Sequence, residues 1–311
     1  MESDLAKDIF MLVDGSAIVH RAYHAMPPFT TSSGTPTGAV SGFFSMLLKL
    51  IQELRPYHIV VAFDRPKPTF RQQLYVGYQA QRPKMESDLS EQFGAIIDIL
   101  HKAKIQEFAV DGYEADDIIG TLSERANKQG IFTYIVTGDR DMLQLVDRDT
   151  KILMPIKGIS EVKIMEEKDI KEKYGVEPAQ FVDLKALTGD ASDNYPGVPG
   201  IGPKTAANLI NEYGNVENIY KHLDDVAVKN KNLAQKLIDG AESAILGKKL
   251  ATILKDVPFV CEFDDCLTTK IDIAAFKTAL EEYEFKTLPK RVDEVLTEKQ
   301  KTKKENQMKL L

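Results

Sequence analysis

Short apolar segments that each end in an aspartate are the feature that most constrains the fold of this chain. Ile9–Val13 is followed by Asp14, and His58–Phe63 ends next to Asp64. Between them, Thr37–Leu54 has the apolar spacing of a helix and a glycine near its start. Strand, helix and strand in this order favour an α/β layer with a parallel sheet. Sheets of this kind place their sites at the carboxyl ends of the strands.

The alternation of strands and helices continues to about residue 165. We expect helices at Leu89–Ala103 and Glu114–Lys128, strands at Glu107–Val110 and Phe132–Val136, and a closing hairpin of Thr150–Ile156 and Glu161–Met165. Beyond Glu167 the patterns are helical, at Asp169–Tyr174, Pro178–Leu187, Lys204–Tyr213, Asn232–Asp239, Ser243–Leu254 and Ile273–Tyr283. The sequence therefore predicts an α/β domain followed by a mostly helical domain.

Composition narrows the class of protein. The 311 residues, 43% of them hydrophobic, suffice for two ordinary domains. The first apolar run is only as long as a strand and follows no basic stretch, so we expect neither a signal peptide nor a membrane span, and a cytoplasmic location. Cys261 and Cys266 lack the spacing of a zinc site, and we expect reduced core thiols. The net charge of −7 opposes nucleic-acid binding unless basic residues gather locally.

Carboxylates gather where the predicted strands end and helices begin. They are Asp14, Asp64, Glu114, Asp116, Asp117, Asp139, Asp141, Asp190 and Asp193. Any one of them is typical of a helix cap or an exposed surface. Together they would repel one another unless cations neutralised them, and Mg²⁺ prefers such oxygen ligands. Two divalent ions about 4 Å apart can activate water and stabilise the leaving oxygen in phosphodiester hydrolysis.

Covalent catalysis has less support than metal-assisted phosphoryl transfer. No Ser/His/Asp order is present in the sequence, and we expect the histidines to lie away from the strand ends. They are His20, His24, His58, His101 and His222.

A basic segment directly follows Asp64. Residues 65–84 read RPKPTFRQQLYVGYQAQRPK and contain no acid, with Arg65, Lys67, Arg71, Arg82 and Lys84 interleaved with Phe70, Tyr75 and Tyr78. Cations that follow a backbone, with aromatic rings on which bases stack, are typical of sites for single-stranded nucleic acid. A solvated helix whose aromatic rings face the core is the alternative.

A glycine-rich hairpin lies between Asp193 and the helix predicted from Lys204. Its sequence GVPGIGPKTA offers free backbone N–H groups at a helix start, which suit a phosphate oxygen. Acids a few residues away would repel the same phosphate. The conflict disappears if the acids hold metal at one phosphate and the hairpin binds another.

These segments resemble the bacterial 5′ nucleases related to flap endonucleases, especially the N-terminal 5′→3′ exonuclease domain of DNA polymerase I. The resemblance rests, in order, on MLVDGSAIVHRAYHAMPP, PTGAVSGFF, VAFDRPKPTFR, GYEADDIIGTL, TGDRDMLQLV, LTGDASDNYPGVPGIGPKTA and EYEFK. It implies a PIN-like nuclease domain at residues 1–175 with a helical arch at about 65–88. It further implies a helical DNA-binding domain at 176–290, with a helix-hairpin-helix motif at about 189–214, and a tail or linker at 291–311.

The resemblance also implies roles for single residues. Asp14, Asp64, Glu114 and Asp116 match the ligands of a first metal, Asp139, Asp141 and Asp193 those of a second, and Asp117 and Asp190 further acids of the family. Arg21, Arg71 and Arg82 match basic positions near the 5′ phosphate and the arch, and Tyr78 matches an arch aromatic. Gly200, Gly202, Lys204 and Thr205 match the duplex-binding turn, where family members often hold K⁺.

One position departs from the family pattern. The arch motif commonly reads Tyr-Lys-x-x-Arg, with the lysine at the scissile phosphate, whereas this chain has Gln79 in place of the lysine. Lys84 lies two residues past Arg82, and its long side chain could supply the missing charge. We therefore expect an active nuclease with altered phosphate contacts.

The resemblance implies cleavage of 5′ ends and 5′ flaps of DNA, and of the RNA or DNA strand ahead of a primer, in replication and repair. It implies two divalent cations, Mg²⁺ or Mn²⁺, and a monomer that is fused to a DNA polymerase or works beside one. Two alternatives stay open. A branched-DNA-binding paralogue without catalysis would usually lack some of the acids, and a PIN-type ribonuclease has no reason to carry the hairpin and the second domain.

Overall fold

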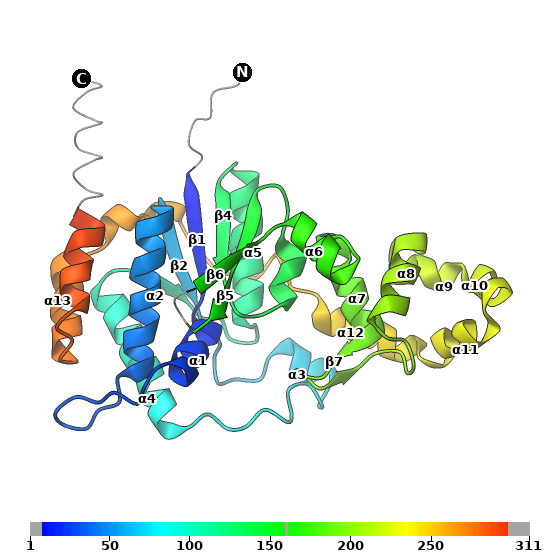
Figure 1. Cartoon of the computed structure of the whole chain (residues 1–311), viewed down its shortest axis with the longest axis horizontal. Coiled ribbons are helices and arrows are strands. Elements are labelled where there is room, and N and C mark those ends of the chain that lie inside the picture. The colour runs from blue at the N-terminus through cyan, green and yellow to red at the C-terminus, as the bar shows by residue number, and fades with distance from the viewer. Residues whose placement is uncertain (1–7, 159–160, 298–311) are drawn as a thin grey trace, which may run out of the picture.

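The computed structural model describes residues 8–158 and 161–297 and contains a six-stranded sheet of order β3-β2-β1-β4-β5-β6. Strands β1 (Ile9–Asp14), β2 (His58–Ala62), β3 (Gln106–Phe108), β4 (Phe132–Val136) and β5 (Thr150–Lys157) are parallel to one another. The edge strand β6 (Glu161–Met165) pairs antiparallel with β5. The predicted, mostly parallel sheet with its closing hairpin is confirmed (Figure 1).

Both faces of the sheet are covered by helices. Phe10 and Leu12 of β1 belong to the core under α5 (Ala115–Lys128), and Met11 and Val13 to the core on the opposite face. That opposite core is formed with α1 (Gly15–Ala25), α2 (Gly38–Leu54) and α4 (Ser87–Lys102). Strands buried on two faces need apolar residues at every position, which explains the continuous apolar runs in the sequence.

The register of the sheet brings the carboxyl ends of the strands together. Asp14 at the end of β1 pairs with Ala62, two residues before Asp64. Val136 at the end of β4 lies opposite Val13. The loops that carry the acids therefore leave the sheet at one edge.

The helical domain extends from one end of the sheet (Figure 1). After α6 (Glu167–Tyr174) it contains α7 (Phe181–Thr188), α8 (Pro203–Tyr213), α9 (Val216–Lys221), α10 (Leu223–Lys229), α11 (Lys231–Asp239) and α12 (Ala241–Ala251). Helix α7 packs against α8 and α12. Between α7 and α8 lies a small hairpin of β7 (Gly189–Asp190) and β8 (Tyr195–Pro196).

After α12 the chain returns to the α/β layer. Leu267 forms a bridge with His58 beside β2, and the hydroxyl of Thr268 donates to the carbonyl of Pro56 at 2.6 Å. Helix α13 (Ile273–Glu282) packs against α4, at the opposite end from the helical domain (Figure 1).

The expected domain boundaries at 290 and 291 do not coincide with this packing. Residues 288–297 are helical, and Val292 and Leu296 are buried in the core that includes α2 and α4. The rest of the expected tail, residues 298–311, lies outside the described residues. Apolar side chains at helical spacing in 288–297 explain why this part packs instead of forming a linker.

The arch segment, residues 65–86, contains one short helix, α3 (Phe70–Leu74), followed by turns. The turns are closed by backbone hydrogen bonds from Tyr78 to Tyr75 and from Arg82 to Gln79. Pro66 and Pro68 precede the helix and favour extended backbone there, and Tyr75 at its end is already extended. The expected helical arch is thus mostly non-helical in this structure.

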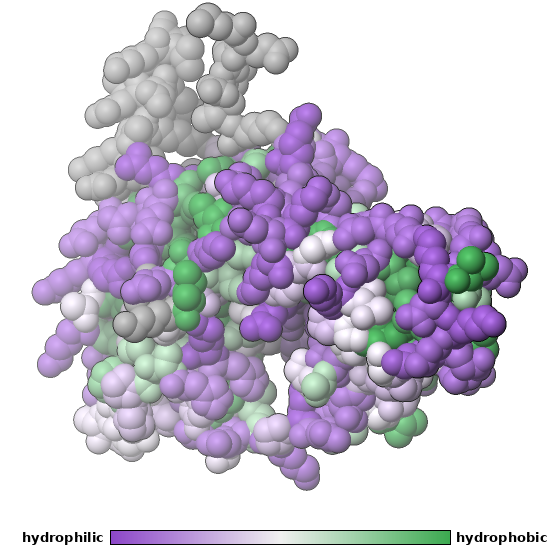
Figure 2. Space-filling view, turned by 45° about the vertical axis from the view of Figure 1, so that its right-hand side comes forward, coloured by the Kyte–Doolittle hydropathy of each residue, from purple (hydrophilic) through white to green (hydrophobic). Residues whose placement is uncertain are grey.

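Hydrophilic side chains dominate the face shown in Figure 2, and hydrophobic ones form small patches. Across the described residues, no helix combines the length and the apolar composition needed to span a bilayer. Cys261 and Cys266 are free thiols whose sulfur atoms lie 3.6 Å apart, and Cys266 is buried.

Candidate active site

A pocket of about 580 Å³ opens at the carboxyl edge of the sheet. The acids that line it are Asp14, Asp64, Glu114, Asp116, Asp139, Asp141 and Asp193. They come from the ends of β1, β2 and β4, from the start of α5 and from the loop before β8. The structure therefore brings together acids from segments that are far apart in the sequence.

Asp14 and Asp64 are held by local donors. Asp14 is 3% exposed and caps α1, with Oδ1 accepting from the backbone N–H of Ala17 at 2.9 Å. Its Oδ2 accepts from the hydroxyl of Thr137 at 2.6 Å. Asp64 Oδ1 accepts from the backbone N–H of Ala115 at 2.9 Å, which ties the end of β2 to the start of α5.

Glu114 and Asp116 enter the pocket from the start of α5. Glu114 precedes the first residue of the helix, and its backbone N–H donates to Asp117 Oδ2 at 3.1 Å. Asp117 is completely buried and lies outside the pocket lining. The family resemblance implied that Asp117 is a further acid of the site. In the structure it lies outside the pocket and binds the backbone of Glu114.

The acids form two groups, the first of Asp14, Asp64, Glu114 and Asp116, and the second of Asp139, Asp141 and Asp193, near Lys185 of α7 and Asp190. One carboxylate oxygen from each of Asp141, Asp190 and Asp193 lies within 4.8 Å of the others. Lys185 Nζ is 2.5 Å from Asp141 Oδ1 and also forms an ion pair with Asp190.

Burial and mutual repulsion raise the pKa of several pocket acids. Burial is the largest cause, and it raises the pKa of Asp14, Glu114 and Asp141 to about 7 in each case. It also raises the pKa of Asp139 and, well above the ordinary value, that of Asp116, with repulsion from neighbouring carboxylates adding to the effect.

A set of carboxylates that are costly to ionise together fits a site for hard cations. Their oxygens are the ligands that Mg²⁺ and Mn²⁺ prefer, and a bound cation would favour the ionised forms. The residues present therefore could hold divalent metal.

The arch segment lies against the pocket. Arg82 donates to Asp193 Oδ1 at 2.7 Å, and Gln79 Nε2 donates to the same oxygen at 3.2 Å. The hydroxyl of Tyr78 is 3.1 Å from Glu114 Oε2, and its ring stacks on Tyr195. Residues on the predicted arch thus contact acids of both groups.

Other predicted residues lie elsewhere. Arg71 reaches the pocket wall but is 2% exposed and paired with Asp117. Asp190 and Lys84 are outside the lining of this pocket. Arg21 donates to the carbonyl of Gly158 at 2.6 Å.

The predicted duplex-binding turn precedes α8. Gly200 has φ of +77°, a conformation in which a side chain would be strained, and Gly202 is the residue before the helix. Lys204 is exposed on the first turn of α8, and Thr205 is partly exposed beside it. Lys236 of α11 donates to the carbonyl of Gly200 at 3.2 Å and places a further cation at the turn.

Sequence reasoning missed three polar residues of the site. Thr137 is the first residue of the segment TGDRDMLQLV, two positions before Asp139, so its position was a usable signal. Lys185 lies five residues before Asp190 on a helix, which also could have been noticed. His20 of α1 lines the pocket, which corrects the expectation that every histidine lies away from the strand ends, because α1 was not predicted.

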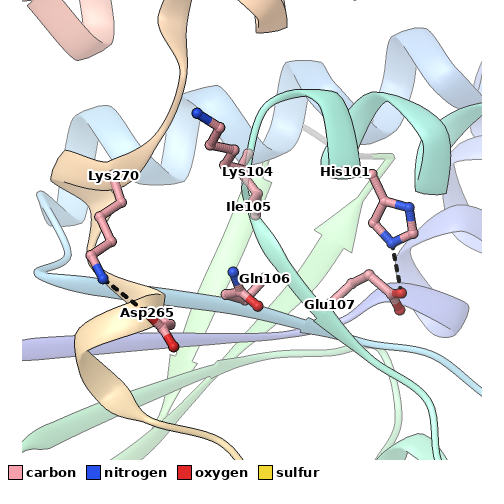
Figure 3. Close-up of a pocket in the computed structure, with 7 residues that line it drawn as sticks. All are labelled: His101, Lys104, Ile105, Gln106, Glu107, Asp265 and Lys270. Atoms are coloured by element: carbon pink, nitrogen blue, oxygen red, sulfur yellow. Dashed lines mark hydrogen bonds and ion pairs between the residues drawn. The ribbon is translucent and has the colours of Figure 1, made fainter.

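A smaller cavity of about 330 Å³ lies beside β3 (Figure 3). Its charged side chains are paired, His101 with Glu107 at 2.9 Å and Lys270 with Asp265 at 2.8 Å. Because these charges neutralise one another and no group of acids converges there, this cavity is a weaker candidate for a catalytic site.

Two family models match successive parts of the chain. Residues 9–175 match the family described as 5′-3′ exonuclease, N-terminal resolvase-like domain, and residues 176–274 match 5′-3′ exonuclease, C-terminal SAM fold. DNA polymerase I of Bacillus caldotenax is 38% identical over 295 residues, which are 95% of this chain and 33% of that protein. DNA polymerase I of Bacillus subtilis is 40% identical over 248 residues, which are 80% of this chain and 28% of that protein.

The chain thus spans about a third of the length of these curated relatives. Among solved structures, the zinc-bound 5′-exonuclease of T5 has a TM-score of 0.64 at 24% identity, with 93% of this chain and 98% of that chain covered. The catalytic core of Rad2 in complex with DNA has a TM-score of 0.59 at 19% identity, with 94% and 92% covered. At these identities the structural likeness supports the fold.

Proposed function

The chain belongs to the 5′-3′ exonuclease family, and on that premise we propose that it hydrolyses phosphodiester bonds at the 5′ ends and 5′ flaps of DNA. The acidic pocket is the proposed active site. The observation that carries the proposal is the convergence of Asp14, Asp64, Glu114, Asp116, Asp139, Asp141 and Asp193 on one pocket that the arch segment borders. Strands ahead of a growing primer, including RNA primers, are the proposed substrates in replication and repair.

The acids are proposed to bind two divalent cations, Mg²⁺ or Mn²⁺. Asp14, Asp64, Glu114 and Asp116 would hold one, and Asp139, Asp141 and Asp193 the other. Bound cations would supply an activated water and stabilisation of the leaving oxygen. Asp117 would orient the backbone of Glu114, and Asp190 would keep Lys185 beside the second group.

The arch cations would bind the phosphate backbone near the cleaved bond. Arg82 is half exposed while it contacts Asp193, so its guanidinium can exchange that carboxylate for a phosphate. Arg65 and Lys67 also line the pocket and share Asp111 as a partner. Local cations of this kind answer the objection from the net charge of −7.

The turn before α8 would grip a second phosphate on the duplex, with K⁺ as a proposed ligand of the turn. A cavity of about 520 Å³ lies beside the start of α8, and its lining includes Arg140, Lys185 and Pro203, the first residue of that helix. The acidic pocket and the turn before α8 would thus contact different phosphates of one substrate. We propose that the protein is a monomer. It would be fused to a DNA polymerase or would act together with one, since the curated relatives are DNA polymerases I.

The test is cleavage of a labelled 5′-flap duplex in Mg²⁺, with single-stranded RNA as the competing substrate. We expect flap cleavage that EDTA abolishes and that Asp139→Asn reduces strongly. Asp224→Asn removes an exposed acid of α10, remote from the pocket, and should leave the rate unchanged. Flap binding without cleavage would support a catalytically inactive paralogue instead, and preferred cleavage of the RNA would support a ribonuclease.

Gly202→Ala tests separately whether the turn before α8 binds a phosphate of the duplex. Gly200 is a poor probe because its positive φ strains any side chain, whereas a Cβ on Gly202 meets no atom within 4 Å of this chain. We expect Gly202→Ala to weaken duplex binding, since the added methyl group blocks close approach of a phosphate. Gly94→Ala in α4, where a Cβ is equally unhindered, is the matched control. Equal duplex affinity of the two variants would exclude the turn as a phosphate site.

A further inference from the structure

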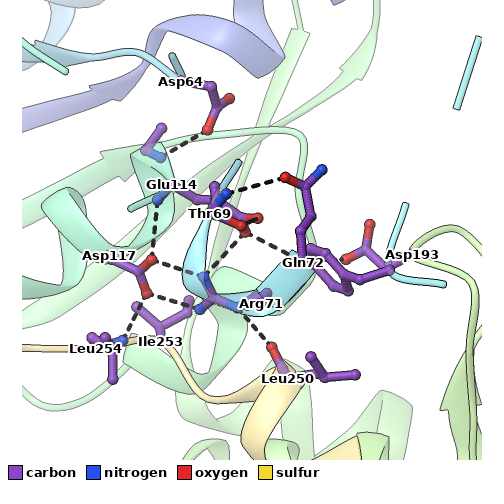
Figure 4. Close-up of polar contacts among 12 residues, drawn as sticks. Asp64, Thr69, Arg71, Gln72, Glu114, Asp117, Asp193, Leu250, Ile253 and Leu254 are labelled. Atoms are coloured by element: carbon purple, nitrogen blue, oxygen red, sulfur yellow. Dashed lines mark hydrogen bonds and ion pairs between the residues drawn. The ribbon is translucent and has the colours of Figure 1, made fainter. Parts of the chain in front are cut away.

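Arg71 on α3 has every donor of its guanidinium engaged. Nη1 and Nη2 donate to Oδ2 and Oδ1 of Asp117 at 2.7 and 2.8 Å, and Nη1 also donates to Glu114 Oε2 at 3.1 Å. Nε donates to the carbonyl of Leu250 and Nη2 to the carbonyl of Thr252, both at 2.8 Å. An arginine has five N–H donors, so none is left for a phosphate in this structure. Figure 4 shows the contacts of Arg71 with Asp117 and Leu250.

These contacts join three separate parts of the molecule. Arg71 lies on the arch segment, and Asp117 and Glu114 lie at the start of α5. Leu250 is on the last turn of α12, and Thr252 directly follows that helix, at the end of the helical domain. The guanidinium is therefore the point at which arch, nuclease domain and helical domain meet.

Besides Arg71, the carboxylate of Asp117 binds two backbone N–H groups. Its Oδ2 accepts from the backbone N–H of Glu114 at 3.1 Å, and its Oδ1 accepts from the backbone N–H of Leu254 at 2.9 Å. The side chain is completely buried. A buried carboxylate with one cationic partner depends strongly on that partner.

Both carboxylate oxygens of Glu114 are held from the arch. The hydroxyl of Thr69 donates to Oε1 at 3.1 Å, and Tyr78 and Arg71 each contact Oε2 at 3.1 Å. The position of this pocket acid thus depends on how the arch is docked.

We propose that Arg71 is a positioning residue that makes the placement of Glu114 depend on the docking of both the arch and the helical domain. The proposal rests on the proposed function, because it takes Glu114 as a ligand of divalent metal. Arg71 then acts through Glu114 and Asp117 and does not contact the DNA, which differs from the role that the family resemblance implied.

Lysine cannot replace arginine in this arrangement. A lysine ammonium has three donors without the planar fork, so it cannot bind Asp117 in a bidentate manner and also reach Glu114 and two carbonyls. Arg71→Lys preserves the charge and therefore separates geometry from electrostatics.

Arg125→Lys is the matched control. Arg125 is a residue of α5, and it donates to the carbonyls of Phe259 and Val257 in the segment after α12. It thus ties α5 to the same returning segment, but it makes no described contact with a pocket acid. Both variants should lower thermal stability.

The experiment measures Mn²⁺ affinity by titration calorimetry and the rate of limited proteolysis within residues 75–85. We expect Arg71→Lys to weaken Mn²⁺ binding by roughly 10-fold or more, as substitutions behind a metal ligand often do. Proteolysis of the arch should become several-fold faster. The kcat for flap cleavage should fall at low Mg²⁺ and recover in part at high Mg²⁺, while KM changes little. Arg125→Lys should change neither metal affinity nor proteolysis.

Asp117→Asn provides a second test of the coupling. If Arg71 acts through Asp117, the losses of Mn²⁺ affinity in the single variants should not add up in the double variant. Additive losses, or an Arg71→Lys protein that matches Arg125→Lys in metal affinity and proteolysis, would overturn the proposal. A wild-type protein that binds Mn²⁺ but does not cleave DNA would contradict the proposed function and leave this comparison of variants valid.

Discussion

The two acidic groups of the pocket are stabilised by different kinds of partner. Among the described residues, Asp14 and Asp64 accept from backbone amides and a hydroxyl and form no ion pair with a cation. In the second group, Asp141 lies beside Lys185, and Asp193 accepts from Arg82. The second group is therefore partly neutralised by the protein itself. In the first group Glu114 has Arg71 as a partner, whereas Asp14 and Asp64 depend on protons or on metal.

The difference indicates different responses to metal removal. A carboxylate paired with Lys185 or Arg82 keeps its charge without metal, but it must exchange that partner when metal binds. A carboxylate held only by neutral donors in a buried position loses stability when it ionises. Substitutions and changes of pH should therefore affect the two groups differently.

The largest expected effect separates an acid inside the pocket from one outside it. Asp116→Asn should lower single-turnover flap cleavage by about 10³-fold, because it removes a proposed metal ligand worth about 4 kcal/mol in the transition state. Asp190→Asn should lower it by only about 10-fold, because Asp190 lies outside the pocket lining and acts through Lys185. Equal losses in the two variants would mean that Asp190 is a direct ligand and that the two acids have the same role.

Replacement of Lys185 comes next. Lys185→Met leaves Asp141 and Asp190 without their cation, and we expect a loss of about 2 kcal/mol in the free energy of unfolding in EDTA. Mg²⁺ should stabilise the variant more than the wild type, because the metal replaces the lost charge. Urea unfolding in EDTA and in Mg²⁺ measures both effects.

Lys229→Met is the control for Lys185→Met. Lys229 pairs with Glu212 on the exposed surface, where an ion pair contributes little to stability. If Lys185→Met is as stable as Lys229→Met in EDTA, Lys185 does not neutralise the second group.

The pH dependence tests the first group. Burial raises the pKa of Asp14 from its ordinary value to about 7, so the folded protein holds a proton that the unfolded chain has lost above pH 4. Stability in EDTA should therefore fall as the pH rises from 6 to 8, by about 1 kcal/mol for this one group. Asp14→Asn should remove that part of the pH dependence, and saturating Mg²⁺ should do the same. Stability that rises with pH in EDTA would contradict the assignment.

The smallest expected effect concerns the arch residue that contacts the second group. Gln79 Nε2 is 3.2 Å from Asp193 Oδ1 without carrying charge. Gln79→Lys should raise flap cleavage roughly threefold through attraction of a phosphate, and Lys84→Ala should lower it by a similar factor. Cleavage rates that stay unchanged in both variants would show that these positions do not contact the substrate.

The strands and their acids were predictable because their signals are local. Strands β1 and β2 are continuous apolar runs with an aspartate at or just past their ends, so Asp14 and Asp64 could be placed at one edge of the sheet. Helix α1 was missed since it starts with Gly15 directly after a strand, and its cap, Asp14, had been interpreted as a ligand. The cap and the pocket acid are the same residue.

The partners of Arg71 could not be predicted. The acceptor carbonyls of Leu250 and Thr252 lie about 180 positions after Arg71 in the chain. Backbone carbonyls carry no sequence signal. A basic residue between aromatic rings is typical of nucleic-acid binding, and only the tertiary structure shows that this one is buried. The packing of residues 288–297 against the nuclease domain was missed for the same reason, because it depends on contacts with α2 and α4.

The return of the chain after α12 makes the helical domain an insertion with two connections. One connection enters through α6, and the other leaves through the residues that bind Arg71 and Asp117. The two connections are not the whole attachment, because Leu187 of α7 and Ala244 of α12 belong to the same buried core as Leu12 of β1. A shared core of this kind resists deformation, so the turn before α8 and the acidic pocket form one rigid template for a duplex that contacts both.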